Sequence, residues 1–193
     1  MYYINNMCGI FAYLDTTNNK ELIDTLKKEW EKSSNRGPDN HQWKLYPHIL
    51  MGFHRLAIMD LSPEGNQPFE DSNSAIICNG EIYNYQHLNK SFDLHTNSNS
   101  DCETLLALAN KLQVFNLTNG QSQFQQINTF CQQLDGVFAF VLHNHTTGQT
   151  IIGRDPFGVR PLFIGYCYSH TQKKMVFSIA SEAKSLLSFC QYV

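Results

Sequence analysis

The 193-residue chain is long enough for one well-buried domain and short for two, and 42% hydrophobic with 16% charged residues is typical of a globular protein. Its formal net charge of −3 gives no reason to expect a nucleic acid or an anionic membrane as partner. No apolar run approaches the roughly 20 residues of a membrane span, and the short apolar stretch from Ile10 to Leu14 lacks the basic flank of a signal peptide.

Cysteine and histidine usage argues against a metal site. The six cysteines show no CxxC pair and no regular spacing, which fits thiols in a reducing compartment better than a disulfide framework or a zinc site. The eight histidines show no HExxH or similar ligand spacing. A glycine-rich phosphate-binding loop is also absent from the sequence. We therefore expect a cytoplasmic protein with no metal and no cofactor.

Strands and helices alternate along the chain, with no linker that would divide it. Apolar runs predict strands at residues 8–14, 49–53, 56–59, 75–78, 137–142, 150–153, 162–166 and 176–180. Apolar residues at helical spacing predict helices over 22–30, 105–112 and 124–134, and a short one that begins at 182. The segment 113–129 is rich in Asn, Gln and Ser and is predicted to be a solvated insertion. Sheets covered by helices indicate a layered α+β domain.

The first chemical motif is the cysteine of Met7-Cys8-Gly9-Ile10-Phe11. If the chain began at Met7 and that methionine were removed, Cys8 would carry both a thiol and a free α-amine. A thiol with a pKa of about 8.5 is only a few per cent ionised at neutral pH, and an α-amine with a pKa of about 7.7–8.0 can act as its base. With the upstream residues attached, the Cys8 nitrogen is a non-basic amide. We therefore expect 1–7 to be a leader or a mis-assigned start, and the domain to span 8–193.

An asparagine–glycine pair and one arginine offer groups for a substrate. Asn79 and Gly80 follow the strand predicted at 75–78, where a side-chain amide and a glycine N–H can form an oxyanion hole. Those two residues alone favour the alternative, an Asn-Gly hairpin turn. Arg55 interrupts an apolar segment, where a guanidinium can hold a carboxylate through two hydrogen bonds or form a structural ion pair.

Two further motifs have structural interpretations. Ser100-Asp101-Cys102-Glu103 has the S-x-x-E form of a helix capping box, which would leave Asp101 pointing outward to bind an ammonium group. The charged connection at 153–162 is punctuated by glycine and proline, and its Asp and Arg residues are expected to lock a loop rather than act on a substrate.

In their order and spacing these segments resemble the class II glutamine amidotransferase domain of asparagine synthetase, particularly of the eukaryotic type. The resemblance runs from Met7 to about Leu187. It rests on Met7–Phe11, Arg36–Asp39, His54–Ile58, Asn79–Asn84, Ser100–Glu103, Leu134–Phe140, Gly153–Leu162 and Ser181–Lys184. The resemblance implies the four-layer αββα sandwich of the N-terminal-nucleophile hydrolases.

The resemblance also implies a reaction on L-glutamine. Cys8 would attack the side-chain amide, with its own amine shuttling the proton, and Asn79 and Gly80 would stabilise the oxyanion. Water would then release glutamate from the thioester after ammonia has left.

By the same resemblance, Arg55 would hold the α-carboxylate of glutamine. Asp101, with help around Glu81, would hold the α-ammonium group. Main-chain groups from Leu56 to Met59, including Ile58, would line the pocket.

Asparagine synthetases continue into an ATP-dependent synthetase domain that consumes the ammonia, whereas this sequence ends at Val193. We expect either a separate synthetase subunit as partner or a free glutaminase. Two alternatives stay open: a catalytically silent glutamine-binding or regulatory module, and an inert fragment of a truncated gene.

Overall fold

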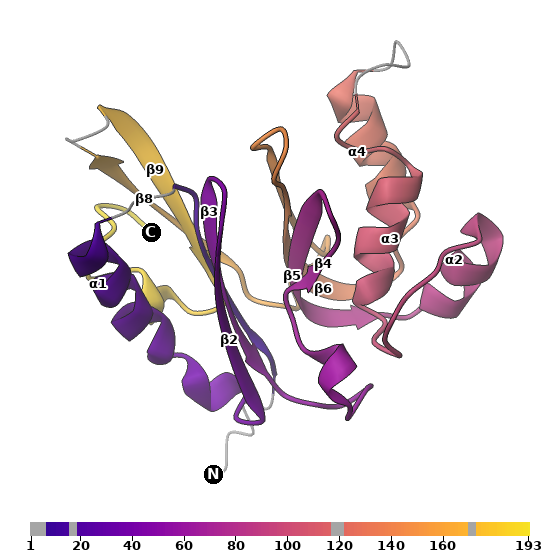
Figure 1. Ribbon diagram of the computed structural model, residues 1–193, viewed down its shortest axis with the longest axis horizontal. Helices are drawn as coiled ribbons and strands as arrows, with labels where there is room; N and C mark the ends of the chain where they lie inside the picture. Colours follow the sequence, from indigo (N-terminus) through magenta and orange to yellow (C-terminus); the bar gives the residue numbers. More distant parts are fainter. Residues whose placement is uncertain (1–6, 16–18, 117–121, 170–172) are drawn as a thin grey trace.

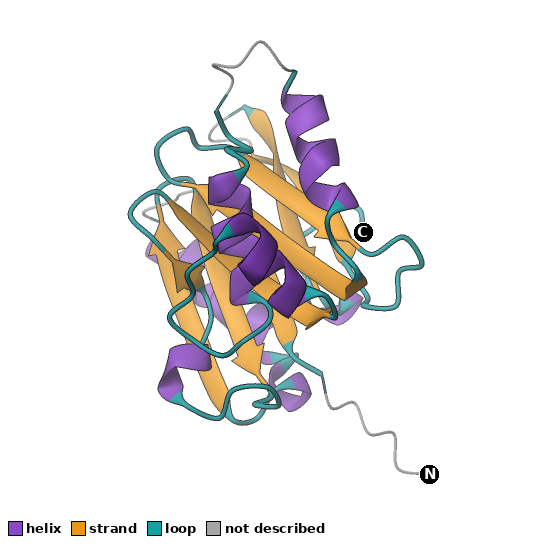
Figure 2. Ribbon diagram, turned by 90° about the vertical axis from the view of Figure 1, so that its right-hand side faces the viewer, coloured by secondary structure: helices purple, strands orange, loops and turns teal. Residues whose placement is uncertain are grey.

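The structure is a computed structural model that describes residues 7–15, 19–116, 122–169 and 173–193. Two antiparallel sheets pack face to face, with α1 outside one and α2, α3 and α4 outside the other (Figure 1). Figure 2 looks onto the second sheet and shows helices lying across its outer face. This is the αββα layering that the resemblance implied.

The first sheet has the strand order β2-β3-β1-β9-β8. Its strands are β1 (Gly9–Tyr13), β2 (Asn40–Tyr46), β3 (Ile49–Arg55), β8 (Phe163–Ser169) and β9 (Lys174–Ala180). The second sheet has the order β4-β5-β6-β7, formed by β4 (Phe69–Glu70), β5 (Ser74–Ile82), β6 (Gly136–Asn144) and β7 (Thr150–Arg154).

The helices are α1 (Lys20–Glu31), α2 (Tyr85–Phe92), α3 (Glu103–Lys111) and α4 (Gln123–Gln132). Three short 3₁₀ turns, η1 (Ser34–Arg36), η2 (Pro63–Gly65) and η3 (Ala183–Ser185), complete the described elements. No helix in these described ranges has the length and apolarity needed to cross a membrane.

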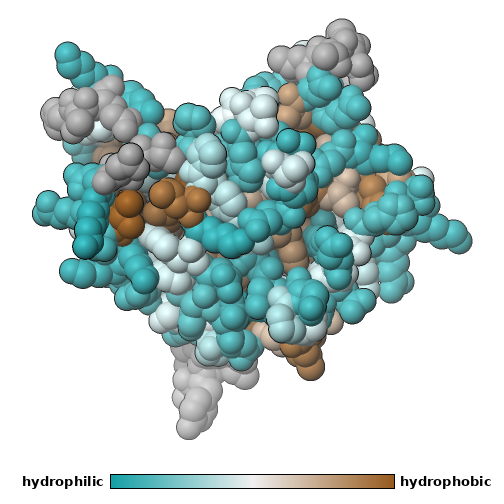
Figure 3. All heavy atoms as spheres, in the orientation of Figure 1, coloured by the Kyte–Doolittle hydropathy of each residue, from teal (hydrophilic) through white to brown (hydrophobic). Residues whose placement is uncertain are grey.

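The central strands are apolar on both faces because each sheet is covered on both sides. In β1, Ile10 and Ala12 pack in the cluster between the sheets, while Phe11 and Tyr13 pack in a second cluster that includes Leu26 of α1. Alternate side chains of a strand point to opposite faces, so burial of both faces removes the usual alternation of polar and apolar residues. This explains why continuous apolar runs predicted these strands. On the outside, hydrophilic residues cover most of the face drawn in Figure 3.

The structure also corrects several predicted elements. The segment 56–59 is a loop rather than a strand, and the short helix expected from 182 is the 3₁₀ turn η3. The sequence patterns missed β2, β4 and α2. An edge strand with a half-polar sequence such as β2, and an eight-residue helix such as α2, give weak periodic signals.

The glutamine-rich segment is less solvated than predicted. Val114 is buried at 0% exposure, and the Gln126 side chain is buried where its Nε2 donates to the carbonyl of Asn116 at 2.6 Å. Residues 117–121 of this segment lie outside the described residues.

Candidate active site

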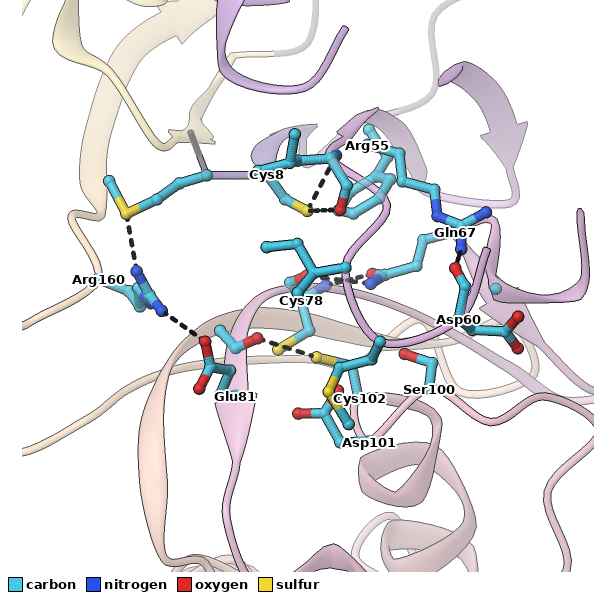
Figure 4. A pocket seen from close by; sticks show the side chains of 17 residues that line it. Cys8, Arg55, Asp60, Gln67, Cys78, Glu81, Ser100, Asp101, Cys102 and Arg160 are labelled. Atoms are coloured by element: carbon cyan, nitrogen blue, oxygen red, sulfur yellow. Dashed lines mark hydrogen bonds and ion pairs between the residues drawn. The ribbon is translucent and has the colours of Figure 1, made fainter. Parts of the chain in front are cut away.

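A cavity of about 110 Å³ opens where the ends of β1, β3 and β5 approach the start of α3. Cys8 and Arg55 lie on one side of this pocket, and Glu81 and Asp101 lie on the other (Figure 4). These four predicted site residues come from parts of the chain far apart in sequence. The fold therefore brings a thiol, a guanidinium and two carboxylates to one cavity.

Cys8 immediately precedes β1, and its thiol is held by the backbone of Leu56. The Leu56 N–H donates to Sγ at 3.4 Å, and Sγ lies 3.6 Å from the Leu56 carbonyl oxygen, to which the thiol donates. Burial raises the pKa of the Cys8 thiol, and the Leu56 hydrogen bond opposes that rise only in part. A buried thiol of raised pKa needs a base to become a nucleophile.

Asn79 and Gly80 lie within β5, not in a turn. They pair with Ala139 and Phe138 of β6, which excludes the Asn-Gly hairpin alternative and extends the strand beyond the predicted 75–78. By strand alternation Asn79 shares the inner face with Ile77, which packs between the sheets as Cys8 does. Asn79 is 2% exposed, and its Nδ2 has no hydrogen-bond partner among the described residues.

An unsatisfied buried amide costs on the order of 1–3 kcal/mol, so natural proteins keep few of them outside functional sites. Gly80, the next residue, lines the pocket itself. A Cβ there would overlap the Val137 carbonyl oxygen of β6, so only glycine fits this position. Asn79 and Gly80 therefore offer adjacent N–H donors, although the Asn79 side chain is not among the groups that line the cavity.

Arg55 ends β3, and the following loop holds its guanidinium. Nη1 donates to the Ser62 carbonyl at 2.8 Å and to Asn66 Oδ1 at 2.7 Å, and Nη2 donates to the Asp60 carbonyl. Within the part of the chain that the structure describes, no carboxylate forms an ion pair with Arg55. The structural ion pair that the sequence allowed is therefore not found, and the guanidinium charge at the pocket has no bound counter-charge.

Asp101 lies just before α3 and is 3% exposed, so it does not point out into solvent as expected. Its Oδ2 accepts the Ile82 N–H at 2.6 Å. Burial raises the pKa of the Asp101 carboxyl, and nearby Glu81 raises it further. Backbone hydrogen bonds from the N–H groups of Ile82, Asp101 and Cys102 oppose this rise. A cationic ligand group would stabilise the charged form.

The predicted capping box is wrong. Glu103 accepts hydrogen bonds from the backbone N–H groups of Asn97 and Ser98 and from the Ser98 hydroxyl, instead of from Ser100. The first residue flanking α3 is Cys102, which makes no side-chain cap. The loop before α3 folds back so tightly that Glu103 reaches farther upstream than the S-x-x-E pattern implies.

The connection at 153–162 does two things. Asp155 accepts the backbone N–H groups of Phe157, Val159 and Arg160, which locks the loop as predicted. Arg160, in contrast, lines the pocket, and its guanidinium lies 2.8 Å from Met7 Sδ and 3.5 Å from Glu81 Oε1.

Leu56 and Ile58 line the pocket from the loop after β3, as the resemblance implied. Sequence reasoning missed several further lining residues, among them Asp60, Gln67, Cys78, Cys102 and Arg160. Their contacts with the pocket depend on long-range packing, and only the isolated charge of Arg160 gave a local signal. No group of three His, Cys, Asp or Glu side chains suited to a metal occurs in the described ranges.

Comparison with known proteins shows the family of the chain. The sequence model of the family described as "Glutamine amidotransferase domain" matches residues 7–193. A probable glutamine-hydrolysing asparagine synthetase of Acanthamoeba polyphaga mimivirus is 38% identical over 97% of this chain and 32% of its own length. Asparagine synthetase 2 of Bacillus subtilis is 31% identical over 94% of this chain and 22% of its own length. The chain thus spans a third or less of these two relatives.

A solved structure shares the fold. The glutamine phosphoribosylpyrophosphate amidotransferase of B. subtilis superposes with a TM-score of 0.66 at 17% identity, over 96% of this chain and 44% of that one. The match confirms the αββα sandwich fold. From the family match, which spans all of the described residues, the chain belongs to the glutamine amidotransferase domain family.

Proposed function

We propose that this domain hydrolyses L-glutamine to glutamate and ammonia, with Cys8 as the nucleophile. The observation that carries the proposal is the position of the Cys8 thiol in a pocket with Arg55 on its own side and Asp101 opposite (Figure 4). A free amino acid carries one carboxylate and one ammonium group. The guanidinium of Arg55, unpaired among the described residues, and the buried carboxyl of Asp101 are matched to these two groups.

The proposed reaction starts from a Cys8 whose α-amine is free. The amine takes the thiol proton, and the thiolate attacks the side-chain amide carbon of glutamine. Asn79 Nδ2 and the Gly80 N–H stabilise the oxygen that becomes negative, and in this role the Asn79 amide gains the partner it lacks. The protonated amine then protonates the leaving nitrogen, which departs as ammonia.

The second half-reaction removes the acyl group. Water adds to the thioester carbon, the amine accepts a proton from that water, and the thiol is regenerated as glutamate leaves. Each half-reaction passes through an oxyanion at the same position, so Asn79 and Gly80 act twice.

Substrate selection rests on the two charged contacts. Arg55 binds the α-carboxylate, Asp101 binds the α-ammonium with Glu81 adding negative charge beside it, and Leu56 and Ile58 line the space between. A glutamine within a polypeptide carries neither charged group. The pocket is therefore proposed to select free glutamine.

The proposal is tested on two forms of the chain, one starting at Cys8 and one retaining residues 1–7. Ammonia release from glutamine is expected from the form that starts at Cys8 and not from the longer one, because only the shorter form has a basic nitrogen on the nucleophile. No turnover by either form would reject the hydrolase proposal.

A silent glutamine-binding module is the second candidate. It is favoured by one observation: the Met7 side chain, at the pocket, contacts Arg160, and the Cys8 nitrogen is an amide while Met7 is attached. Calorimetry and the ammonia assay on both forms separate the two candidates, because a binding module would bind glutamine and release no ammonia even when the chain starts at Cys8.

We further propose that the ammonia is consumed by an ATP-dependent synthetase unit. The support is the naming of the relatives as asparagine synthetases and the small share of their length that this chain covers. We also propose that the activity is cytoplasmic. The test is to mix this domain with an ATP-dependent synthetase domain and to measure asparagine formed from aspartate, ATP and glutamine.

A further inference from the structure

The segment Arg36-Gly37-Pro38-Asp39 contacts the backbone of Cys8 but has no role in the reaction proposed above. Arg36 ends η1 and is 3% exposed. Its Nε donates to the main-chain carbonyl of Cys8 at 2.9 Å, and its Nη1 lies 3.6 Å from Glu182 Oε1. A buried cation is thus bonded to the backbone of the nucleophilic residue itself.

Close packing fixes the segment in place. A Cβ at Gly37 would overlap the His54 carbonyl oxygen of β3, and a Cβ at Gly9 would lie 3.5 Å from both Cβ and Cδ of Arg36. Gly37 is therefore packed tightly against β3, and Arg36 lies beside Gly9 of β1 at ordinary contact distance.

Asp39 holds the other side of the nucleophile. Its backbone N–H donates to the Arg55 carbonyl at 3.0 Å, and its Oδ2 accepts the Ala57 N–H at 2.7 Å. These two bonds flank Leu56, whose N–H and carbonyl hold the Cys8 thiol. One four-residue segment thus holds the Cys8 carbonyl through Arg36 and the Cys8 thiol through Asp39 and Leu56.

Arg36 also has unused hydrogen-bonding capacity. Its Nη2 is buried and has no hydrogen-bond partner among the described residues. The charged or ionisable groups that act on the Cys8 thiol are Arg36 from η1, Arg55 from β3 and Cys78 from β5, and those that act on Arg36 include Glu182 and Arg160. Arg36 is hydrogen-bonded to the Cys8 carbonyl, and the carbonyl carbon is bonded to the same Cα that would carry the free α-amine.

We propose that Arg36 is a positioning residue for Cys8, which orients its amino end through the carbonyl bond and keeps the free amine neutral and basic. This inference rests on the glutaminase proposed above. A neighbouring positive charge disfavours a second one, so the amine stays a proton acceptor at lower pH than it would without Arg36. Asp39 contributes by fixing the Leu56 loop against the thiol.

The test uses the domain that starts at Cys8, with three variants. Arg36→Met removes the charge and the bond, Glu182→Gln removes the opposing charge but leaves Arg36 in place, and Lys44→Met removes a cation from an exposed pair with Glu70 outside the pocket. For each variant, kcat and KM for glutamine are measured across pH, with circular dichroism to confirm the fold.

For Arg36→Met we expect kcat to fall by about 10–100-fold with little change in KM, because the nucleophile is misplaced while substrate contacts remain. The acid limb of kcat/KM should move to higher pH. Glu182→Gln should move this limb to lower pH, because the field of Arg36 is then unopposed. Lys44→Met should move neither, and Arg36→Lys should restore the acid limb while kcat recovers only in part.

An Arg36→Met domain with wild-type kcat and an unmoved acid limb would overturn the inference. If Arg36→Met does not fold, an unmoved acid limb in Glu182→Gln has the same consequence. Failure of the glutaminase proposal would look different, because the unmodified domain that starts at Cys8 would itself release no ammonia.

Discussion

Leu56 holds the Cys8 thiol with both of its backbone polar groups, through an N–H 3.4 Å from Sγ and a carbonyl oxygen 3.6 Å from it. The loop that carries Leu56 also carries Ile58 and begins at Arg55, so it links the nucleophile to the substrate contacts. The thiol is held by backbone atoms of this loop, whereas Arg55 reaches the pocket with its side chain. Substitution of a side chain is therefore expected to change either catalysis by Cys8 or glutamine binding, and not both.

The first prediction concerns Cys8 itself. In the domain that starts at Cys8, Cys8→Ala should abolish ammonia release while glutamine binding by calorimetry remains, because Arg55 and Asp101 are untouched. Cys78→Ala is the control for loss of a thiol that lines the same pocket. Equal turnover by Cys8→Ala would remove the thiol from the mechanism.

The second prediction concerns the charge of Asp101. Burial raises the pKa of Asp101, so the folded state disfavours its ionised form. The protonated carboxyl therefore contributes stability below the ordinary pKa of aspartate, and this contribution is lost as pH rises through the raised pKa. Asp101→Asn keeps an oxygen for the Ile82 N–H but removes that penalty.

We therefore expect Asp101→Asn to weaken glutamine binding and to leave the free energy of unfolding at neutral pH unchanged or higher. Urea unfolding and calorimetry measure the two quantities. A large loss of stability with normal glutamine affinity would mean that Asp101 serves the fold rather than the ligand.

The third prediction concerns Gly80. Gly80→Ala places a Cβ against the Val137 carbonyl oxygen of the paired strand, and should destabilise the domain by about 1–3 kcal/mol while abolishing ammonia release. Gly9→Ala is a stability control, since its Cβ would meet neighbours at an ordinary 3.5 Å. Similar unfolding free energies for both variants would show that β5 and β6 separate easily there.

The fourth prediction concerns acid stability. Burial lowers the pKa of His54 and of His143 from 6.5 to about 4, although the carbonyls of Trp30 and Pro47, respectively, act to raise them. Because the unfolded state binds these protons more readily, stability present above about 6.5 is lost as pH falls toward about 4.

Each histidine should account for a loss on the order of 2–3 kcal/mol over that range. His143→Gln, away from the pocket, should unfold in urea with a smaller difference between pH 7 and pH 4.5 than the unmodified chain. A pH dependence identical to that of the unmodified chain would show that burial does not lower the pKa of His143 in the fold.

The sequence predicted most of the inner layers and the residues that approach the pocket. Apolar runs identify strands that are buried on both faces, and short motifs such as Asn79-Gly80 carry their chemistry locally. The sequence did not predict β2, because the half-polar pattern of an edge strand gives a weak periodic signal. It did not predict the pocket role of Arg160, because that role depends on Met7 and Glu81, which are far away in the chain. The capping box predicted for Ser100 and Glu103 was wrong, because the S-x-x-E pattern does not show how sharply the preceding loop turns.

Asn79 and Gly80 lie inside a paired strand, and this placement determines how the domain loses activity when it unfolds. Their orientation follows from the register of β5 on β6, and a slip by one residue would turn Asn79 away from the space between the sheets. A loop can lose its shape while the rest of a domain stays folded, but these two groups are lost only when the sheet comes apart. Heat or denaturant should therefore extinguish oxyanion stabilisation and the folded state together, in a single transition.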